Sequence, residues 1–257
     1  MNPFGGFEYS ADHAWVERNF PTQRATSYLW SGSSSSDYET ALGNLMFTYG
    51  RLDDPRSVFV LKEPDNWTIE QMASSPIQLA FFAFLARLSG ARRILEIGTF
   101  VGVGAMQLAR ALPEDGVVVS IEKFPVFAEI ARRNVARNGL DGRIHVLTGD
   151  LPALVADGSV TAGFDLVLLD GGKERYAEFL EICLDVLAPR GLIILDNAFF
   201  LGDAVNDDPT TDKGRGVRAS LELVRSRTDL ELSFVPFSDG ILLIRRREDG
   251  VRSGSGS

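Results

Sequence analysis

Four polar residues follow two short apolar runs of the chain, and their types could hold a hard metal ion. Asp170 and Lys173 come after the run FDLVLL, while Asp196 and Asn197 end the run LIILDN. Neighbouring parallel strands lie about 4.8 Å apart, so two carboxylates and an amide could meet at one sheet edge. Oxygen ligands without Cys or His nearby favour Mg²⁺ over zinc or copper, with Mn²⁺ or Ca²⁺ as substitutes. Lys173 is then a candidate general base beside that ion.

A glycine-rich turn earlier in the chain predicts a second ligand site. In ILEIGTFVGVGA, Gly98, Gly102 and Gly104 stand between an expected strand and an expected helix, where backbone N–H groups can meet a ligand closely. Glu122 ends the next apolar run, VVVSIE, and an acidic residue there can accept both hydroxyls of a ribose. The glycine spacing does not meet the dinucleotide fingerprint, and no tyrosine has a lysine four residues later. A nicotinamide-dependent oxidoreductase of the short-chain dehydrogenase kind is therefore disfavoured.

The elements that must position these residues follow an alternating pattern from residue 67 onward. Expected helices, including residues 76–89 and 174–187, separate extended runs in the manner of a parallel sheet covered by helices. The last two runs, ELSFVPF and GILLIRRR, have only a short turn at 238–240 between them, which predicts an antiparallel hairpin. We expect an α/β domain over residues 66–248.

The two ends of the chain differ from this domain in amino-acid composition. Residues 1–65 are rich in aromatic side chains and serines, and we expect an N-terminal arm with a helix after Asp37 that serves as acceptor cap or dimer contact. Residues 249–257 end in RSGSGS and are expected to be a flexible tail.

Composition limits the class of partner. The chain has 257 residues, 45% hydrophobic and 24% charged, with a formal net charge of -9. These values are typical of a globular domain, and the negative charge argues against nucleic acid or an anionic membrane as partner. The single cysteine, Cys183, cannot form an internal disulfide, and no run approaches the roughly 20 apolar residues of a membrane span. We therefore expect a cytoplasmic location, with Cys183 in the core.

These motifs resemble the metal-dependent, S-adenosylmethionine-dependent O-methyltransferases, which include catechol and caffeoyl-CoA O-methyltransferases. The resemblance extends from residue 72 to about 246, through ARRILEIGTFVGVGA, ALPEDG, GRIHVLTGD, FDLVLLDGGK, GLIILDN and the late Asp-Gly pair. It implies a class I methyltransferase, Rossmann-like doubly wound sheet of seven strands with the antiparallel C-terminal hairpin. It also implies methyl transfer from S-adenosylmethionine to a hydroxyl of a small catechol-like or vicinally oxygenated acceptor, and a homodimer.

The resemblance assigns roles to individual residues. Glu96 and Gly98 would bind the methionine end of the cofactor, Glu122 the ribose, and Asp150 would lie near the adenine. The full cofactor set that it implies is Met72, Ser74, Glu96, Gly98, Thr99, Phe100, Gly104, Glu122, Lys123, Gly149, Asp150 and Asp170. Mg²⁺ would be held by Asp170, Asp196 and Asn197, with Lys173 as general base. The acceptor would contact Phe200, Lys173 and Asp239.

Several positions depart from the family pattern. Val103-Gly104 stands where a Tyr-Ser pair is usual, which deletes a hydroxyl near the cofactor carboxylate, and Phe200 stands where the plant enzymes have Trp. Residues 202–216 are long and polar, and we expect them to form the acceptor pocket with the N-terminal arm. His13 and His145 are expected to be surface or strand residues and not catalysts.

Three alternatives remain open at this point. One is a metal-independent methyltransferase acting on an amine, carboxylate or isolated hydroxyl. The others are the NAD-dependent oxidoreductase already disfavoured and a cofactor-binding protein without catalysis.

Overall fold

The computed structural model describes residues 45–46, 48–50, 52–236 and 238–247. Most of the N-terminal arm, His13 and the tail at 249–257 lie outside the described residues. Of the predicted helix after Asp37, only residues 45–46 and 48–49 are described, and they are helical. No helix in the described part is long and apolar enough to cross a membrane.

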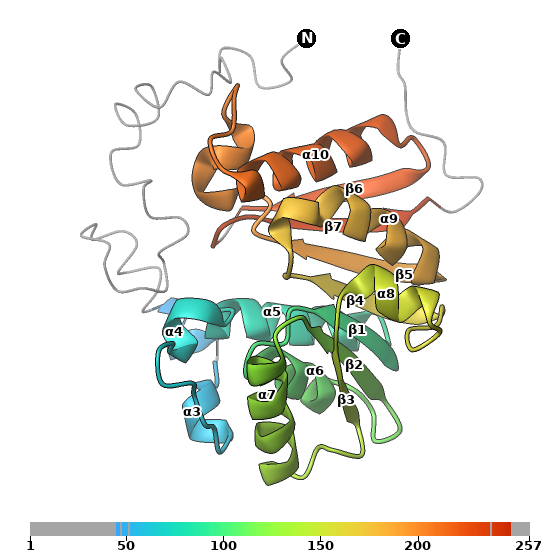
Figure 1. Ribbon diagram of the computed structural model, residues 1–257. Helices are drawn as coiled ribbons and strands as arrows, with labels where there is room; N and C mark the ends of the chain where they lie inside the picture. Colours follow the sequence, from blue (N-terminus) through green and yellow to red (C-terminus); the bar gives the residue numbers. More distant parts are fainter. Residues whose placement is uncertain (1–44, 47, 51, 237, 248–257) are drawn as a thin grey trace.

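A seven-stranded sheet forms the centre of the described chain, in the order β3-β2-β1-β4-β5-β7-β6 (Figure 1). Five strands pair in parallel: β1 (Arg93–Ile97), β2 (Val117–Glu122), β3 (Ile144–Thr148), β4 (Phe164–Leu169) and β5 (Leu187–Asp196). The last two, β6 (Leu230–Val235) and β7 (Ile241–Arg246), form an antiparallel hairpin, and β7 also pairs antiparallel with β5. The predicted doubly wound sheet and its C-terminal hairpin are confirmed.

Helices cover both faces of this sheet (Figure 1). One face packs against α5 (Pro76–Leu88), α6 (Val103–Ala111) and α7 (Pro125–Arg137). The other packs against α8 (Leu151–Ala156), α9 (Tyr176–Val186) and α10 (Asp212–Ser226). Two short helices, α3 (Pro55–Val58) and α4 (Ile69–Met72), precede α5, and two 3-10 turns follow β4 and β5, namely η2 (Lys173–Arg175) and η3 (Phe200–Val205).

Two expected boundaries need correction. The helix expected over residues 174–187 begins as the separate turn η2, and α9 ends one residue earlier than predicted because β5 starts at Leu187. Residues 202–216 are not one polar loop, since η3 occupies their start and the first turn of α10 their end. Thr211 caps that first turn by accepting a hydrogen bond from the Gly214 N–H at 2.9 Å.

Burial explains why strand ends carry the chemistry. Phe164, Leu166, Val167, Leu168 and Leu169 of β4 are all buried, because helices cover this strand on both faces. Apart from Asp165 near its start, whose carboxylate accepts the N–H groups of Arg92 and Arg93, this strand has no polar residue until Asp170 follows its carboxyl end. The strand order reverses between β1 and β4, and the loops after these two strands therefore flank the position at which sheets of this kind bind ligands.

Candidate functional site

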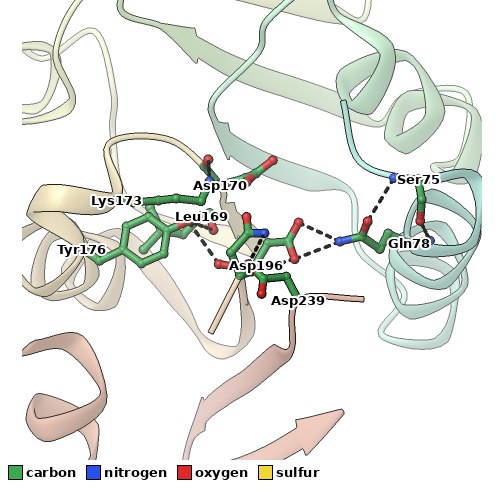
Figure 2. A network of polar contacts seen from close by, with 9 residues as sticks. Ser75, Gln78, Leu169, Asp170, Lys173, Tyr176, Asp196 and Asp239 are labelled. Carbon is green, nitrogen blue, oxygen red and sulfur yellow. Dashed lines mark hydrogen bonds and ion pairs between the residues drawn. The ribbon is translucent and has the colours of Figure 1, made fainter. Parts of the chain in front are cut away.

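The four residues predicted to do chemistry lie together at the carboxyl ends of β4 and β5. Lys173 donates hydrogen bonds from Nζ to the backbone oxygen of Asp170 at 2.8 Å and to its Oδ1 at 2.9 Å (Figure 2). Asp196 follows Leu195 at the end of the adjacent strand and is only 2% exposed. The carboxylates of Asp170 and Asp196 are close enough to raise the pKa of Asp196, after the larger effect of burial.

Asp196 is held by two donors from different parts of the chain. Gln78, at the start of α5, places its Nε2 3.0 Å from both Oδ1 and Oδ2 of Asp196 (Figure 2). The backbone N–H of Asn197 donates to Oδ1 at 2.8 Å. A carboxylate offers about four acceptor positions, and Oδ2 therefore keeps one that these donors leave open.

Asp239 in turn orients Asn197. The Nδ2 of Asn197 donates to Asp239 Oδ2 at 2.9 Å, while Asp239 Oδ1 accepts the Leu201 N–H at 2.6 Å. Both Asn197 and Leu201 have positive φ, 55° each, a conformation that costs energy in residues other than glycine. The hairpin turn before β7 thus fixes the loop after β5, and the amide oxygen of Asn197 is left without a donor in the described part.

The three candidate metal ligands, Asp170, Asp196 and Asn197, each have an oxygen that could bind a hard cation. Asp170 Oδ2 and Asn197 Oδ1 have no hydrogen-bond donor among the described residues, and Asp196 Oδ2 has only Gln78. One carboxylate oxygen each from two residues and one amide oxygen make an all-oxygen set, the kind that Mg²⁺ prefers. No group of three His, Cys, Asp or Glu in the described ranges could hold a metal, and this candidate set includes the amide of Asn197 as its third ligand.

Lys173 is charged and mostly buried in this arrangement. Burial lowers its pKa, but the carboxylates of Asp170, Asp196 and Asp239 together outweigh that effect and hold the pKa above its usual value. A cation bound by the same carboxylates would reverse the balance. The backbone of Lys173 is held by α10, because a Cβ on Gly216 would lie 2.2 Å from the Lys173 carbonyl oxygen.

Tyr176 joins the two strand ends below the site. Its hydroxyl lies 3.1 Å from the Leu169 oxygen of β4 and 3.2 Å from the Asp196 oxygen of β5 (Figure 2). The side chain is fully buried, and burial raises the pKa of the phenol well above its usual value. Tyr176 is therefore a structural donor that ties β4 to β5.

The predicted cofactor turn abuts this cluster. Gly98 has φ 108°, and a Cβ there would lie 3.0 Å from the Gly171 nitrogen; a Cβ on Gly171 would lie 3.0 Å from the Gly98 Cα. The loops after β1 and β4 therefore touch through backbone atoms alone. Glu122, at the end of β2, accepts the N–H groups of Phe100 at 2.8 Å and Phe124 at 2.9 Å. Burial raises the pKa of Glu122 above its usual value, and these backbone donors offset only part of that increase.

Glu96 lies under the same turn and has only hydroxyl support. Ser120, its partner across the β1–β2 pair, donates a very short hydrogen bond to Oε2, and Thr99 Oγ1 lies 2.6 Å from Ser120 Oγ. The Oε1 atom has no donor among the described residues, and a Cβ on Gly104 would lie 2.2 Å from it. Burial raises the pKa of Glu96 to about 8. The side chain that Gly104 lacks would thus fill space now used by the Glu96 carboxylate.

The remaining predicted residues lie around these two clusters. Asp150 forms an ion pair with Arg175, with Nη1 2.6 Å from Oδ2, and Gly149 before it has φ 156°. Met72 is half-exposed, Ser74 is partly buried, and Lys123 is exposed. Phe200 is partly buried against the core, and its contact with the acceptor stays a prediction. His145 is exposed on β3, and Cys183 is fully buried, both as predicted.

Four residues of the site were missed at the sequence level. Gln78, Ser120, Tyr176 and Gly216 each contact a predicted residue through tertiary packing. Only Gln78 had a usable signal, since Ser75 with Gln78 three residues later before an apolar run is a capping-box pattern. That pattern predicts the helix start but not the contact with Asp196.

Comparison with known proteins agrees with this geometry. The model of a family described as O-methyltransferase matches residues 58–247. A catechol O-methyltransferase of Niastella koreensis is 32% identical over 165 residues, which cover 63% of this chain and 74% of the relative. A catechol O-methyltransferase of Mycobacterium tuberculosis is 31% identical over 184 residues, 71% of this chain and 82% of the relative.

A solved structure shares the architecture as well. It is the O-methyltransferase TomG of Streptomyces achromogenes, involved in tomaymycin synthesis and solved with S-adenosylmethionine. TomG is 32% identical, with a TM-score of 0.65 and coverage of 69% of this chain and 83% of that chain. The family match covers most of the sheet and every candidate ligand. The chain therefore belongs to the O-methyltransferase family.

Proposed function

We propose that this protein transfers the methyl group of S-adenosylmethionine to a hydroxyl of a small, vicinally oxygenated acceptor such as a catechol. Asp170, Asp196 and Asn197 would hold Mg²⁺, and Lys173 would take the hydroxyl proton. The observation that supports the metal dependence is that each of these three residues, at the carboxyl ends of β4 and β5, keeps an oxygen with acceptor capacity. The catechol O-methyltransferases among the relatives support the acceptor class.

The residues around the turn after β1, here called the cofactor half (Glu96, Gly98, Gly104 and Glu122), suit a cationic methyl donor. S-adenosylmethionine carries its methyl group on a sulfonium and also bears an ammonium group. Glu96 and Glu122 face the turn after β1 and accept only neutral donors in the described part of the chain. A cationic ligand would favour the ionised form of these carboxylates, including Glu96, whose pKa burial raises to about 8. Glu96 Oε1, without a donor, can accept from an ammonium, while Glu122 can accept from ribose hydroxyls.

The residues at the ends of β4 and β5, here called the chemistry half (Asp170, Lys173, Asp196 and Asn197), suit a hydroxyl that must lose its proton. A phenol has a pKa of about 10 and is a poor nucleophile when protonated. A bound Mg²⁺ would lower the pKa of a hydroxyl that it coordinates. Lys173 can receive the proton once its own ammonium has been discharged, and Asp170 keeps Nζ at the site by the contact at 2.9 Å. Holding the acceptor oxygen close to the methyl carbon would lower the activation barrier further. Well-oriented reactions can gain about 7–11 kcal/mol in this way.

The acceptor pocket would be formed by the loop after β5 together with the N-terminal arm at residues 1–65. Phe199 and Leu201 expose apolar side chains on that loop. Asp203 ties the far end of the loop, because it accepts four hydrogen bonds from the N–H and hydroxyl groups of Thr210 and Thr211 at 2.7–3.0 Å. A fixed apolar wall next to oxygen ligands suits a flat hydroxylated ring.

An acceptor panel tests this proposal. Labelled S-adenosylmethionine is incubated with di- and trihydroxylated aromatics and with their singly hydroxylated analogues, with Mg²⁺ or with EDTA. We expect methylation of vicinal diols that EDTA and Asp170→Ala abolish. Activity that survives both would instead favour a metal-independent methyltransferase. Success on isolated hydroxyls with uniform failure of vicinal diols would refute bidentate binding.

A further inference from the structure

Gln78 occupies a position between two features that are far apart in the sequence. It is the third residue of α5 and is 6% exposed, and its amide lies between Ser75, the N-cap residue, and Asp196 at the end of β5 (Figure 2). Its Oε1 accepts the Ser75 N–H at 3.0 Å, and its backbone N–H donates to Ser75 Oγ at 3.2 Å. Its Nε2 lies 3.0 Å from both carboxylate oxygens of Asp196.

The residue type at this position follows from both contacts. A capping box accepts Glu or Gln as its third residue, because either supplies an oxygen to the N-cap N–H. A Glu at position 78 would direct a second carboxylate at buried Asp196, whereas the Gln amide directs a donor at it. Capping alone therefore does not explain the glutamine, and the contact with Asp196 does.

We propose that Gln78 is a positioning residue for the cation site, an inference that rests on the proposed function. Its amide holds the Asp196 carboxylate in one orientation and leaves Oδ2 available, while its carbonyl oxygen is fixed by the cap of α5. Residues 72–75, which include the predicted cofactor contacts Met72 and Ser74, lead directly into that cap. One buried side chain thus connects the segment beside the cofactor with a ligand of the cation.

Metal affinity tests this role in the full-length protein. Gln78→Met removes the amide at similar side-chain length. Ser75→Ala removes the hydroxyl that caps α5 but leaves the amide beside Asp196. Gln71→Met removes the equivalent capping-box amide of α4, whose Oε1 accepts the Thr68 N–H at 2.8 Å. Mn²⁺ affinity is measured from the spin-resonance signal of free Mn²⁺, together with melting temperatures and the Mg²⁺ concentration that gives half-maximal activity.

We expect Gln78→Met to weaken Mn²⁺ binding about 10–100-fold, the usual effect of losing a partner of a metal ligand. The half-activating Mg²⁺ concentration should rise by the same factor, while kcat at saturating Mg²⁺ stays close to wild type. Ser75→Ala and Gln71→Met should lower the melting temperature and leave Mn²⁺ affinity unchanged.

Two results would overturn the assignment: wild-type Mn²⁺ affinity in Gln78→Met, or an equal loss of affinity in Ser75→Ala. If Gln78→Met does not fold, Gln78→Asn keeps a buried amide but withdraws it from Asp196, and unchanged affinity there would also overturn it. Failure of the wild-type protein to bind Mn²⁺ at all is a separate outcome, which counts against the proposed metal dependence itself.

Discussion

The carboxyl ends of β1 and β2 and those of β4 and β5 both collect buried carboxylates, but they compensate them in opposite ways. On the cofactor side, Glu96 and Glu122 receive hydrogen bonds from a hydroxyl and from backbone N–H groups. Burial is the largest cause of the raised pKa of both residues, and hydrogen bonds from Ser120 and from backbone N–H groups lower it in part. On the chemistry side, Asp170 is paired with the Lys173 ammonium, and Asp196 feels the same charge.

The difference indicates what each half is prepared to receive. Burial raises the pKa of Glu96 to about 8, so a cationic ligand in the cofactor half would favour its ionised form and release its proton. The chemistry half already contains a cation, which means that a metal ion must compete with Lys173 for Asp170. Ligand binding would therefore release a proton from Glu96 in the cofactor half, whereas in the chemistry half it would displace the Lys173 ammonium from Asp170.

Loss of Lys173 should have the largest effect. We expect Lys173→Met to lower kcat by about 10²–10⁴-fold, the usual contribution of a general base, and to leave the dissociation constant of S-adenosylhomocysteine nearly unchanged. Steady-state kinetics and calorimetry measure the two quantities. Lys62→Met, at an exposed lysine away from both clusters, is the matched control. A near wild-type kcat in Lys173→Met would show that Lys173 is not the general base.

Removal of the Glu96 charge should change how stability depends on pH. Glu96 has its pKa raised from 4.5 to about 8 by burial, so the folded state holds a proton that the unfolded state releases. Its contribution to stability is complete below pH 4.5 and is lost as pH rises to about 8, with a slope of up to about 1.4 kcal/mol per pH unit.

Urea unfolding across this range should therefore show a flatter curve for Glu96→Gln than for wild type. A residual slope of the same sign is expected, because the pKa of Asp196 is raised as well. Parallel curves for the two proteins would mean that Glu96 stays ionised when buried, which would contradict its raised pKa.

Gly216 tests the backbone support of the chemistry half. A Cβ at this position meets the Lys173 oxygen at 2.2 Å and the Glu174 carbonyl carbon at 2.5 Å, and main-chain atoms cannot rotate away. We expect Gly216→Ala to lower the free energy of unfolding by about 1–3 kcal/mol and to lower kcat. Gly142→Ala, where a Cβ meets nothing within 4 Å, is the control. Equal stability of the two variants would contradict the packing of α10 against Lys173.

Gly104 offers the corresponding change in the cofactor half, with the smallest expected effect on stability. Its Cβ would meet the end of a side chain, Glu96 Oε1, which can move. Alanine also gains up to about 1 kcal/mol of helix propensity within α6, which offsets part of the clash. We expect Gly104→Ala to keep nearly wild-type stability but to weaken S-adenosylhomocysteine binding in calorimetry. Unchanged affinity for S-adenosylhomocysteine in Gly104→Ala would indicate that Glu96 does not contact the cofactor.

The sequence predicts what lies along one segment better than what meets across segments. Each apolar run that ends in Asp or Glu became a strand with its acidic residue at the carboxyl end, because strand and loop are local properties. The contact between Gln78 and Asp196 joins positions 118 residues apart, and no periodicity encodes it. Ser120 lies beside Glu96 only through the register of β1 against β2.

Gly104 shows how a correct observation led to an incomplete interpretation. The sequence comparison treated the glycine as the loss of a hydroxyl. In the folded chain, the same space belongs to Glu96, and Ser120 supplies a hydroxyl from the other strand. Which side chain fills a gap depends on cross-strand packing, which the chain order of residues does not reveal.

The contact between Gly98 and Gly171 bears on how acceptor preference can diverge. At this contact, main-chain atoms of the loop after β1, which would carry the methyl donor, lie against main-chain atoms of the loop after β4, which would carry Asp170 and Lys173. No change of rotamer and no ordinary substitution elsewhere can lengthen the separation of the two loops at this contact. Substitutions in the loop after β5 can therefore select a new acceptor while the path of the transferred carbon keeps its length, so that reactivity and selectivity can evolve independently.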